Sequence, residues 1–149
     1  MRYVQEIMSN RVLWVGVLCW FAAQFMKIIL TAVIERRWDF SRLLFGHGGM
    51  PSSHSAMVCG MATAVGIARG FYSVEFAVCT LMAFIVMTDA TGVRRAAGKQ
   101  AAVLNKIVQD LIEAGEWPST EKLKEMLGHT PFQVIIGALL GVLVALLFM

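Results

Sequence analysis

The chain has 149 residues, of which 58% are hydrophobic and only 15% are charged, and its mean hydropathy is +0.67. This composition excludes a disordered chain and argues against a soluble globular domain, which needs a polar surface. The formal net charge is +3, but no dense basic run with interleaved aromatic residues occurs, so we expect no nucleic-acid partner.

Four apolar blocks follow one another along the chain, and a bilayer crossing takes roughly 20 residues of helix. The blocks run from Val12 to Ile34, Ser55 to Arg69, Phe71 to Met87 and Pro131 to Met149. The sequence therefore predicts an all-α fold, an integral membrane helical bundle of about four transmembrane helices, with residues 1–149 in a single domain. The first block is too long for a signal peptide and no small-residue cleavage site follows it.

Other segments have the pattern of amphipathic interfacial helices. The first ten residues carry apolar side chains at helical spacing, which predicts a short anchor at the membrane surface. Residues 97–115 are apolar along one side and charged elsewhere, so this helix should lie on the membrane or cap the bundle. A short polar helix is predicted over residues 120–127, after the break at Trp117 and Pro118.

Small residues recur at every fourth position in two of the apolar blocks. Such a stripe clears one face of a helix and lets another helix approach closely, which favours packing inside one bundle and leaves open a homo-oligomer through the same faces. The three cysteines lie in apolar blocks without metal-ligand spacing and are interpreted as small packing residues. The stripes are Ala56, Gly60, Ala64 and Ala68, and Gly137, Gly141 and Ala145; the cysteines are Cys19, Cys59 and Cys79.

A glycine-rich turn leads into the start of the second apolar helix, over residues 46–56. Pro51 suits a first helical turn, and the free backbone N–H groups there form an anion site together with the hydroxyls of Ser52 and Ser53. The plainer interpretation is a helix cap that follows a flexible turn.

Further polar residues stand where an apolar helix ends or begins. Arg94 and Arg95 follow the third block, although adjacent arginines at a helix end are often ordinary interfacial charges. His129 precedes the fourth block, with Gln133 one turn on, placed to hold its ring. Lys27 lies within the first block, where a lysine can snorkel to the interface but an ionisable group by default indicates function.

In an up-and-down bundle these clusters meet on one membrane face, because each lies at the same end of its helix. The meeting point would hold two histidines, two or more arginines, a lysine and a helix N-terminus, with no pair of carboxylates or cysteines for a metal. This inventory indicates handling of a phosphate group without a metal or other cofactor.

On these residues the chain resembles the phosphatidic acid phosphatase type 2 (PAP2) superfamily, the lipid phosphatases related to vanadium haloperoxidases, over about residues 20–141. It is most similar to the small divergent branch of bacterial and plant membrane proteins. The segment Pro51-Ser52-Ser53-His54 is similar to the one that supplies the general-acid histidine of the superfamily, which implies that role for His54.

The remaining motifs match in part. His129, Gln133, Val134, Gly137 and Gly141 reproduce the spacing of the last motif, which implies that His129 is the nucleophile. Gln133 stands where an acid is expected, and an amide can accept the imidazole N–H but cannot stabilise the imidazolium with a charge. Arg94 and Arg95 look like the phosphate-binding arginine, and Lys27 with Arg36 or Arg37 is similar to the first motif without its proline.

The first hypothesis is a metal-independent phosphatase of lipid phosphates that acts through a phosphohistidine. Candidate substrates are phosphatidate, phosphatidylglycerol phosphate and polyprenyl phosphates or diphosphates. The alternative is a non-catalytic membrane protein that binds or translocates a phospholipid at the retained phosphate site, and a weaker one is a structural protein whose basic loops touch headgroups. The predicted phosphate ligands are Lys27, Arg36, Arg37, Ser52, Ser53, Arg94 and Arg95, and the predicted catalytic residues are His129, His54 and Gln133.

The basic residues also predict an orientation. Most lie on the face that carries the clusters, so the positive-inside rule puts this face in the cytoplasm and both termini outside, in a bacterial inner membrane. The basic residues on the site face are Arg36, Arg37, Arg42, Arg94, Arg95, Lys99, Lys106, Lys122 and Lys124, against Arg2, Arg11 and Arg69 opposite.

Overall fold

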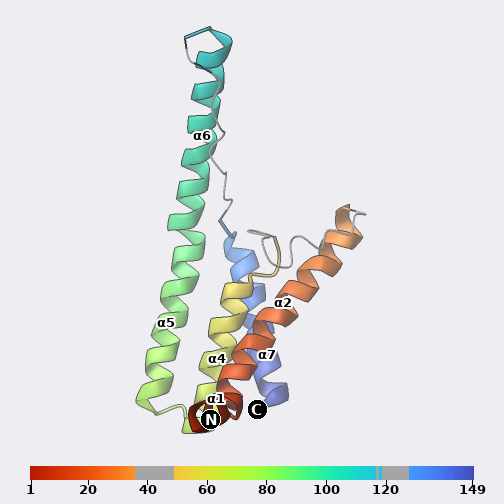
Figure 1. Ribbon diagram of the computed structural model, residues 1–149, viewed down its shortest axis with the longest axis vertical. Helices are drawn as coiled ribbons and strands as arrows, with labels where there is room; N and C mark the ends of the chain where they lie inside the picture. Colours follow the sequence, from red (N-terminus) through yellow and green to blue (C-terminus); the bar gives the residue numbers. More distant parts are fainter. Residues whose placement is uncertain (36–48, 117, 119–127) are drawn as a thin grey trace.

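The computed structural model describes residues 1–35, 49–116, 118 and 128–149, and all regular structure within them is helical (Figure 1). The predicted all-α bundle is therefore confirmed. The helices are α1 (Arg2–Met8), α2 (Arg11–Glu35), α4 (Ser53–Arg69), α5 (Val74–Thr91), α6 (Val93–Glu113) and α7 (Pro131–Phe148).

Helix α4 stands at the centre of the bundle, where it packs on α2, α5 and α7. Both chain ends lie at one end of the bundle, and α1 crosses below it (Figure 1). The Arg11 guanidinium donates to the carbonyl oxygens of Phe148 and Met149 at 3.2 and 3.3 Å, and so ties the start of α2 to the end of α7. The opposite end of the bundle is formed by the starts of α4 and α7 and the end of α5.

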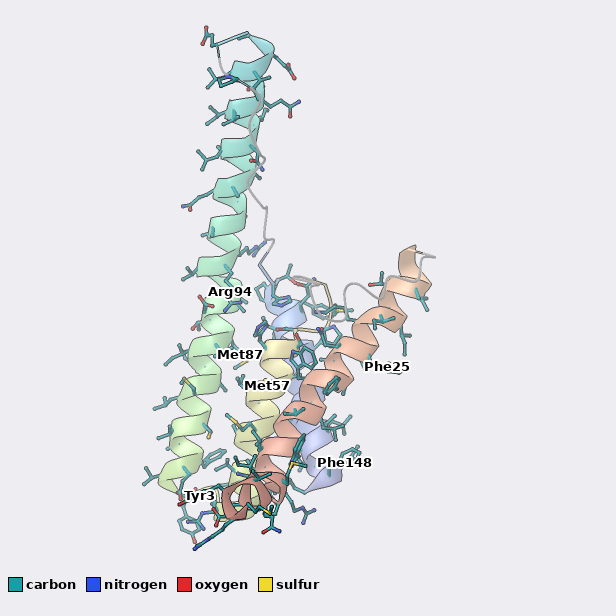
Figure 2. All side chains as sticks on the ribbon, viewed as in Figure 1. Tyr3, Phe25, Met57, Met87, Arg94 and Phe148 are labelled. Atoms are coloured by element: carbon teal, nitrogen blue, oxygen red, sulfur yellow. The ribbon has the colours of Figure 1, made fainter. Side chains whose placement is uncertain are left out.

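Three stretches are long and apolar enough to cross a membrane: Arg11–Val33, Val74–Glu113 and Pro131–Phe148. Helix α4 is shorter, with 17 residues, and is enclosed by the others, so the expected number of about four membrane helices fits. Large apolar side chains point outward from the bundle, as lipid-facing residues do. Phe25 on α2 is 64% exposed and projects away from the neighbouring helices (Figure 2).

The small-residue stripes of α4 and α7 pack against each other. A Cβ atom added to Gly141 would collide with the backbone oxygen of Ala56, and one added to Gly137 would collide with that of Ser52. Further along the same stripe of α4, Gly60 lies directly against the sulfur of Cys19, which is fully buried, and close to the carbonyl oxygen of Gly141. The stripes therefore bring backbone against backbone, as their spacing predicts.

Helix α6 differs from the prediction in its start and its position. It begins at Val93, four residues before the predicted start, because Gly92 ends α5 and opens α6 in the same step. Instead of capping the bundle, α6 continues from α5 away from the bundle end (Figure 1). The predicted N-terminal helix is found as α1, whereas the helix predicted over residues 120–127 lies outside the described residues.

Candidate functional site

The interior of the bundle changes character halfway along its length. Near the chain ends the core is apolar and consists of Val15, Cys19, Ala23, Ala56, Ala64, Val144 and Ala145. Towards the other end polar side chains are buried as well, and in the described part of the chain they are Gln24, Lys27, Thr31, Ser52, Ser53, Ser55 and His129. We call this second region the polar end of the bundle. A cluster of buried polar groups inside a membrane bundle needs internal partners or a polar ligand.

Helix α2 lines the polar end with one face. Lys27 is only 3% exposed, and Gly49, at φ +82°, packs on its aliphatic stem: a Cβ there would lie 3.6 Å from the Lys27 Cδ atom. Gln24 and Thr31 lie one turn on either side of Lys27 and are buried on the same face. Sequence reasoning missed these two residues. The sequence does contain a pattern that indicates them: Gln24, Lys27 and Thr31 are polar residues spaced three and four apart within an otherwise apolar helix.

The start of α4 is held by its own serines. Ser52 is the N-cap, and its hydroxyl oxygen accepts hydrogen bonds from the Ser55 N–H at 3.4 Å and the Ser55 hydroxyl at 2.9 Å. The Ser52 N–H donates to the carbonyl oxygen of Gln133 at 3.1 Å, which joins α4 to α7. The helix-cap interpretation is thus confirmed for Ser52, because its hydroxyl accepts a hydrogen bond from the backbone of the first turn of α4. Ser53, in the first turn, is also buried.

His129 immediately precedes α7 and faces inward. It is 8% exposed, and its backbone N–H donates to the carbonyl oxygen of Ala90, in the last turn of α5, at 3.1 Å. The preceding residue, Gly128, lies against the backbone of Arg95 with no room for a side chain. These contacts bring the histidine segment and the arginine segment together, as the bundle argument predicts. The imidazole Nδ1 is buried and has no hydrogen-bond partner among the described residues.

Gln133 has a structural task at the start of α7. Its Oε1 accepts a hydrogen bond from the Thr130 N–H at 2.9 Å, while the Thr130 hydroxyl accepts one from the Gln133 N–H at 3.4 Å. This reciprocal arrangement is a capping box. The Gln133 side chain also lies beside the His129 ring, but it makes no bond of hydrogen-bonding geometry with Nδ1.

The surroundings of His129 favour its neutral form. Burial is the largest effect and lowers the pKa of the imidazole below its ordinary value, whereas the neighbouring Gln133 amide acts in the opposite direction. The positive charges of Lys27, His54 and Arg94 lower this pKa further. Because His129 is then uncharged near neutral pH, a ring nitrogen with a lone pair is available for nucleophilic attack.

The arginines lie at the junction of α5 and α6, where Figure 2 labels Arg94. The Arg94 Nε donates to Asp89 Oδ2 at 2.6 Å, across the Gly92 that separates the two helices. Arg95 is exposed and contributes its backbone to the contact with Gly128. His54, in the first turn of α4, is exposed but close enough for its charge to act on His129.

Most of the predicted site residues meet at the polar end. The structure brings together the starts of α4 and α7, the inner face of α2 and the α5–α6 junction. Arg36 and Arg37 lie outside the described residues. The residues that meet are Lys27, Ser52, Ser53, His54, Arg94, Arg95, His129 and Gln133.

Comparisons with known proteins give a family and one curated relative. The profile described as the Divergent PAP2 family matches residues 8–144. The chain is 41% identical over 151 residues to the uncharacterized membrane protein YuiD of Bacillus subtilis strain 168, and the match covers 95% of each chain. No solved structure matches.

Proposed function

The chain belongs to the divergent PAP2 family of membrane proteins, and from this premise we propose that it hydrolyses phosphate esters of membrane lipids through a phosphohistidine. The observation that carries the proposal is His129 itself. It is a buried histidine with a lowered pKa, surrounded by the positive charges of Lys27, His54 and Arg94 at the end of a membrane bundle. No simple structural need explains so many cationic groups around one buried ring.

In the first step, the imidazole Nε2 of His129 attacks phosphorus. Because Nδ1 is buried, Nε2 is the nitrogen left to meet a substrate. A nitrogen–phosphorus bond forms while the bond from phosphorus to the lipid alcohol oxygen breaks, and protonated His54 gives its proton to that oxygen. Lys27, Arg94 and the N–H groups at the start of α4 balance the charge on the remaining phosphate oxygens.

In the second step, water attacks the phosphohistidine. His54 takes one proton from the water molecule, the nitrogen–phosphorus bond breaks, and inorganic phosphate leaves with His129 neutral again. Cationic side chains and helix N–H groups supply the electrostatic stabilisation in both steps, so the reaction is proposed to need no metal.

The rival function is binding of a phospholipid without hydrolysis, and one observation favours it. No acid or carbonyl oxygen in the described residues accepts a hydrogen bond from His129 Nδ1, so within this part of the chain no acceptor fixes the tautomer that nucleophilic attack requires. Translocation through the bundle is less well supported. Gly60 lies against Cys19 and Gly141 lies against Ala56, so α2, α4 and α7 are in direct contact below the polar end.

Release of inorganic phosphate from detergent-solubilised protein separates hydrolysis from binding. We expect release from at least one of phosphatidate, phosphatidylglycerol phosphate or a polyprenyl phosphate in the presence of a metal chelator. Vanadate should inhibit, since a pocket shaped for five-coordinate phosphorus also fits five-coordinate vanadium. Loss of activity with chelator that magnesium restores would contradict the metal-free mechanism. A folded protein that binds these lipids and releases no phosphate would support the rival function.

The site is proposed to face the cytoplasm of a bacterial cell. Cysteine introduced at Glu116, which is exposed just beyond the end of α6, should resist a membrane-impermeant thiol reagent in intact cells and react after lysis. Cysteine at Tyr72, which is 95% exposed in the turn at the opposite end of the bundle, is the matched control and should react in intact cells. Both variants are made without Cys19, Cys59 and Cys79. The reverse labelling pattern would put the site outside.

A further inference from the structure

The ion pair between Asp89 and Arg94 runs against the helix dipoles. Asp89 is in the last turn of α5, where a negative charge is disfavoured, and Arg94 is in the first turn of α6, where a positive charge is disfavoured. Neither residue caps its helix, because Gly92 fills both cap positions. Helix stability therefore gives no reason for this pair.

A second ion pair, at the other end of the bundle, has the opposite arrangement of charges relative to the helix dipoles. Arg69 is in the last turn of α4 and Glu75 is in the first turn of α5, so each charge suits the dipole of its own helix. The two side chains are 3.2 Å apart and 66% and 53% exposed. Arg69 and Glu75 thus form the kind of pair that helix ends favour, which makes the reversed pair at the site more informative.

The bond to Asp89 occupies one particular nitrogen of Arg94. Asp89 Oδ2 accepts from Nε at 2.6 Å, which leaves the two terminal nitrogens as the fork that could hold a phosphate through parallel hydrogen bonds. Arg94 is half-exposed, with 52% of its side chain accessible, so without the carboxylate it would sample many rotamers. The backbone bond from His129 to Ala90, the residue after Asp89, joins the His129 segment to the end of α5, and the charge of Arg94 acts on the imidazole.

We infer that Asp89 is a positioning residue that aims the Arg94 fork at the phosphate group bound beside His129. The inference rests on the proposed function only for its phosphate site, not for hydrolysis. Holding the arginine before the ligand arrives reduces the ordering needed on binding, and so strengthens binding without a direct contact between Asp89 and the ligand.

Binding of orthovanadate to the full-length protein in detergent, measured by calorimetry, tests this inference. Asp89→Asn is expected to weaken binding about tenfold, comparable with Arg94→Gln, and the double variant should be no weaker than Arg94→Gln alone. Asp89→Glu should restore most of the affinity, because it keeps the charge that holds Nε. Glu75→Gln, which breaks the pair at the other end, should bind like the unaltered protein. The melting temperature of each variant shows that the fold is kept.

Each result has one meaning. Unchanged binding by Asp89→Asn, independent losses that multiply in the double variant, or no recovery with Asp89→Glu would each overturn the positioning role. An unaltered protein that binds vanadate but releases no phosphate from any lipid contradicts the proposed hydrolysis and leaves the Asp89 result intact. An unaltered protein that binds no vanadate would overturn both.

Discussion

Replacing His129 by alanine is expected to lower phosphate release by roughly 10³-fold or more, because it removes the atom that forms the covalent intermediate. The measurement is phosphate release from the substrate that the unaltered protein hydrolyses fastest. Rapid quenching with a ³²P-labelled substrate should trap an acid-labile phosphoprotein in the unaltered chain and none in His129→Ala. Label retained by the His129→Ala variant would place the nucleophile elsewhere.

His54→Ala gives the comparison that separates the two histidines. If His54 protonates the leaving alkoxide, its loss should be severe for a lipid alcohol and much milder for an aryl phosphate, whose leaving group needs no proton. His129→Ala should be equally damaging with both substrates.

The neutral form of His129 is the reactive one and its pKa is lowered, so the activity that depends on it should persist below the ordinary histidine pKa and fall only at more acidic pH.

Replacing Gly141 by alanine is expected to destabilise the bundle by roughly 1–3 kcal/mol, the usual cost of forcing a methyl group into a packed interior. The added Cβ would collide with the Ala56 carbonyl oxygen, which belongs to the backbone of α4 and cannot turn aside. Because α4 contacts α2, α5 and α7, any shift of α4 disturbs its packing against all three helices. Thermal unfolding in detergent measures the change.

The matched control is Gly16→Ala on α2. A Cβ at Gly16 would lie 3.6 Å from the Met61 Cβ atom, an ordinary contact, so this variant should be neutral or slightly more stable through better helix propensity. Equal melting temperatures for the Gly141→Ala and Gly16→Ala variants would mean that α4 and α7 are not held as close together as Gly141 and Ala56 indicate.

The membrane helices could be predicted from the sequence because their signal is local. Each apolar block is continuous, and its ends are marked by residues that break or cap a helix, as Thr130 and Pro131 do for α7. The small residues at every fourth position likewise predicted a close contact between helices, since a stripe on one helix face has no other use inside a bundle. The convergence of His129, Arg94 and the start of α4 followed from the alternating direction of the helices.

What the sequence determined by itself was thus which segments form the apolar helices and which chemical groups gather at one end of the bundle. Only the tertiary structure decided how those groups are used. Gln24 and Thr31 belong to the site because α2 turns the same face inward as Lys27. The Gln133 side-chain oxygen accepts a hydrogen bond from the Thr130 N–H, because backbone N–H groups at the start of a helix have no partner within the helix. Asp89 meets Arg94 because Gly92 is the single residue between the last turn of α5 and the first turn of α6. These pairings depend on distances between backbones, which a residue pattern along one chain does not contain.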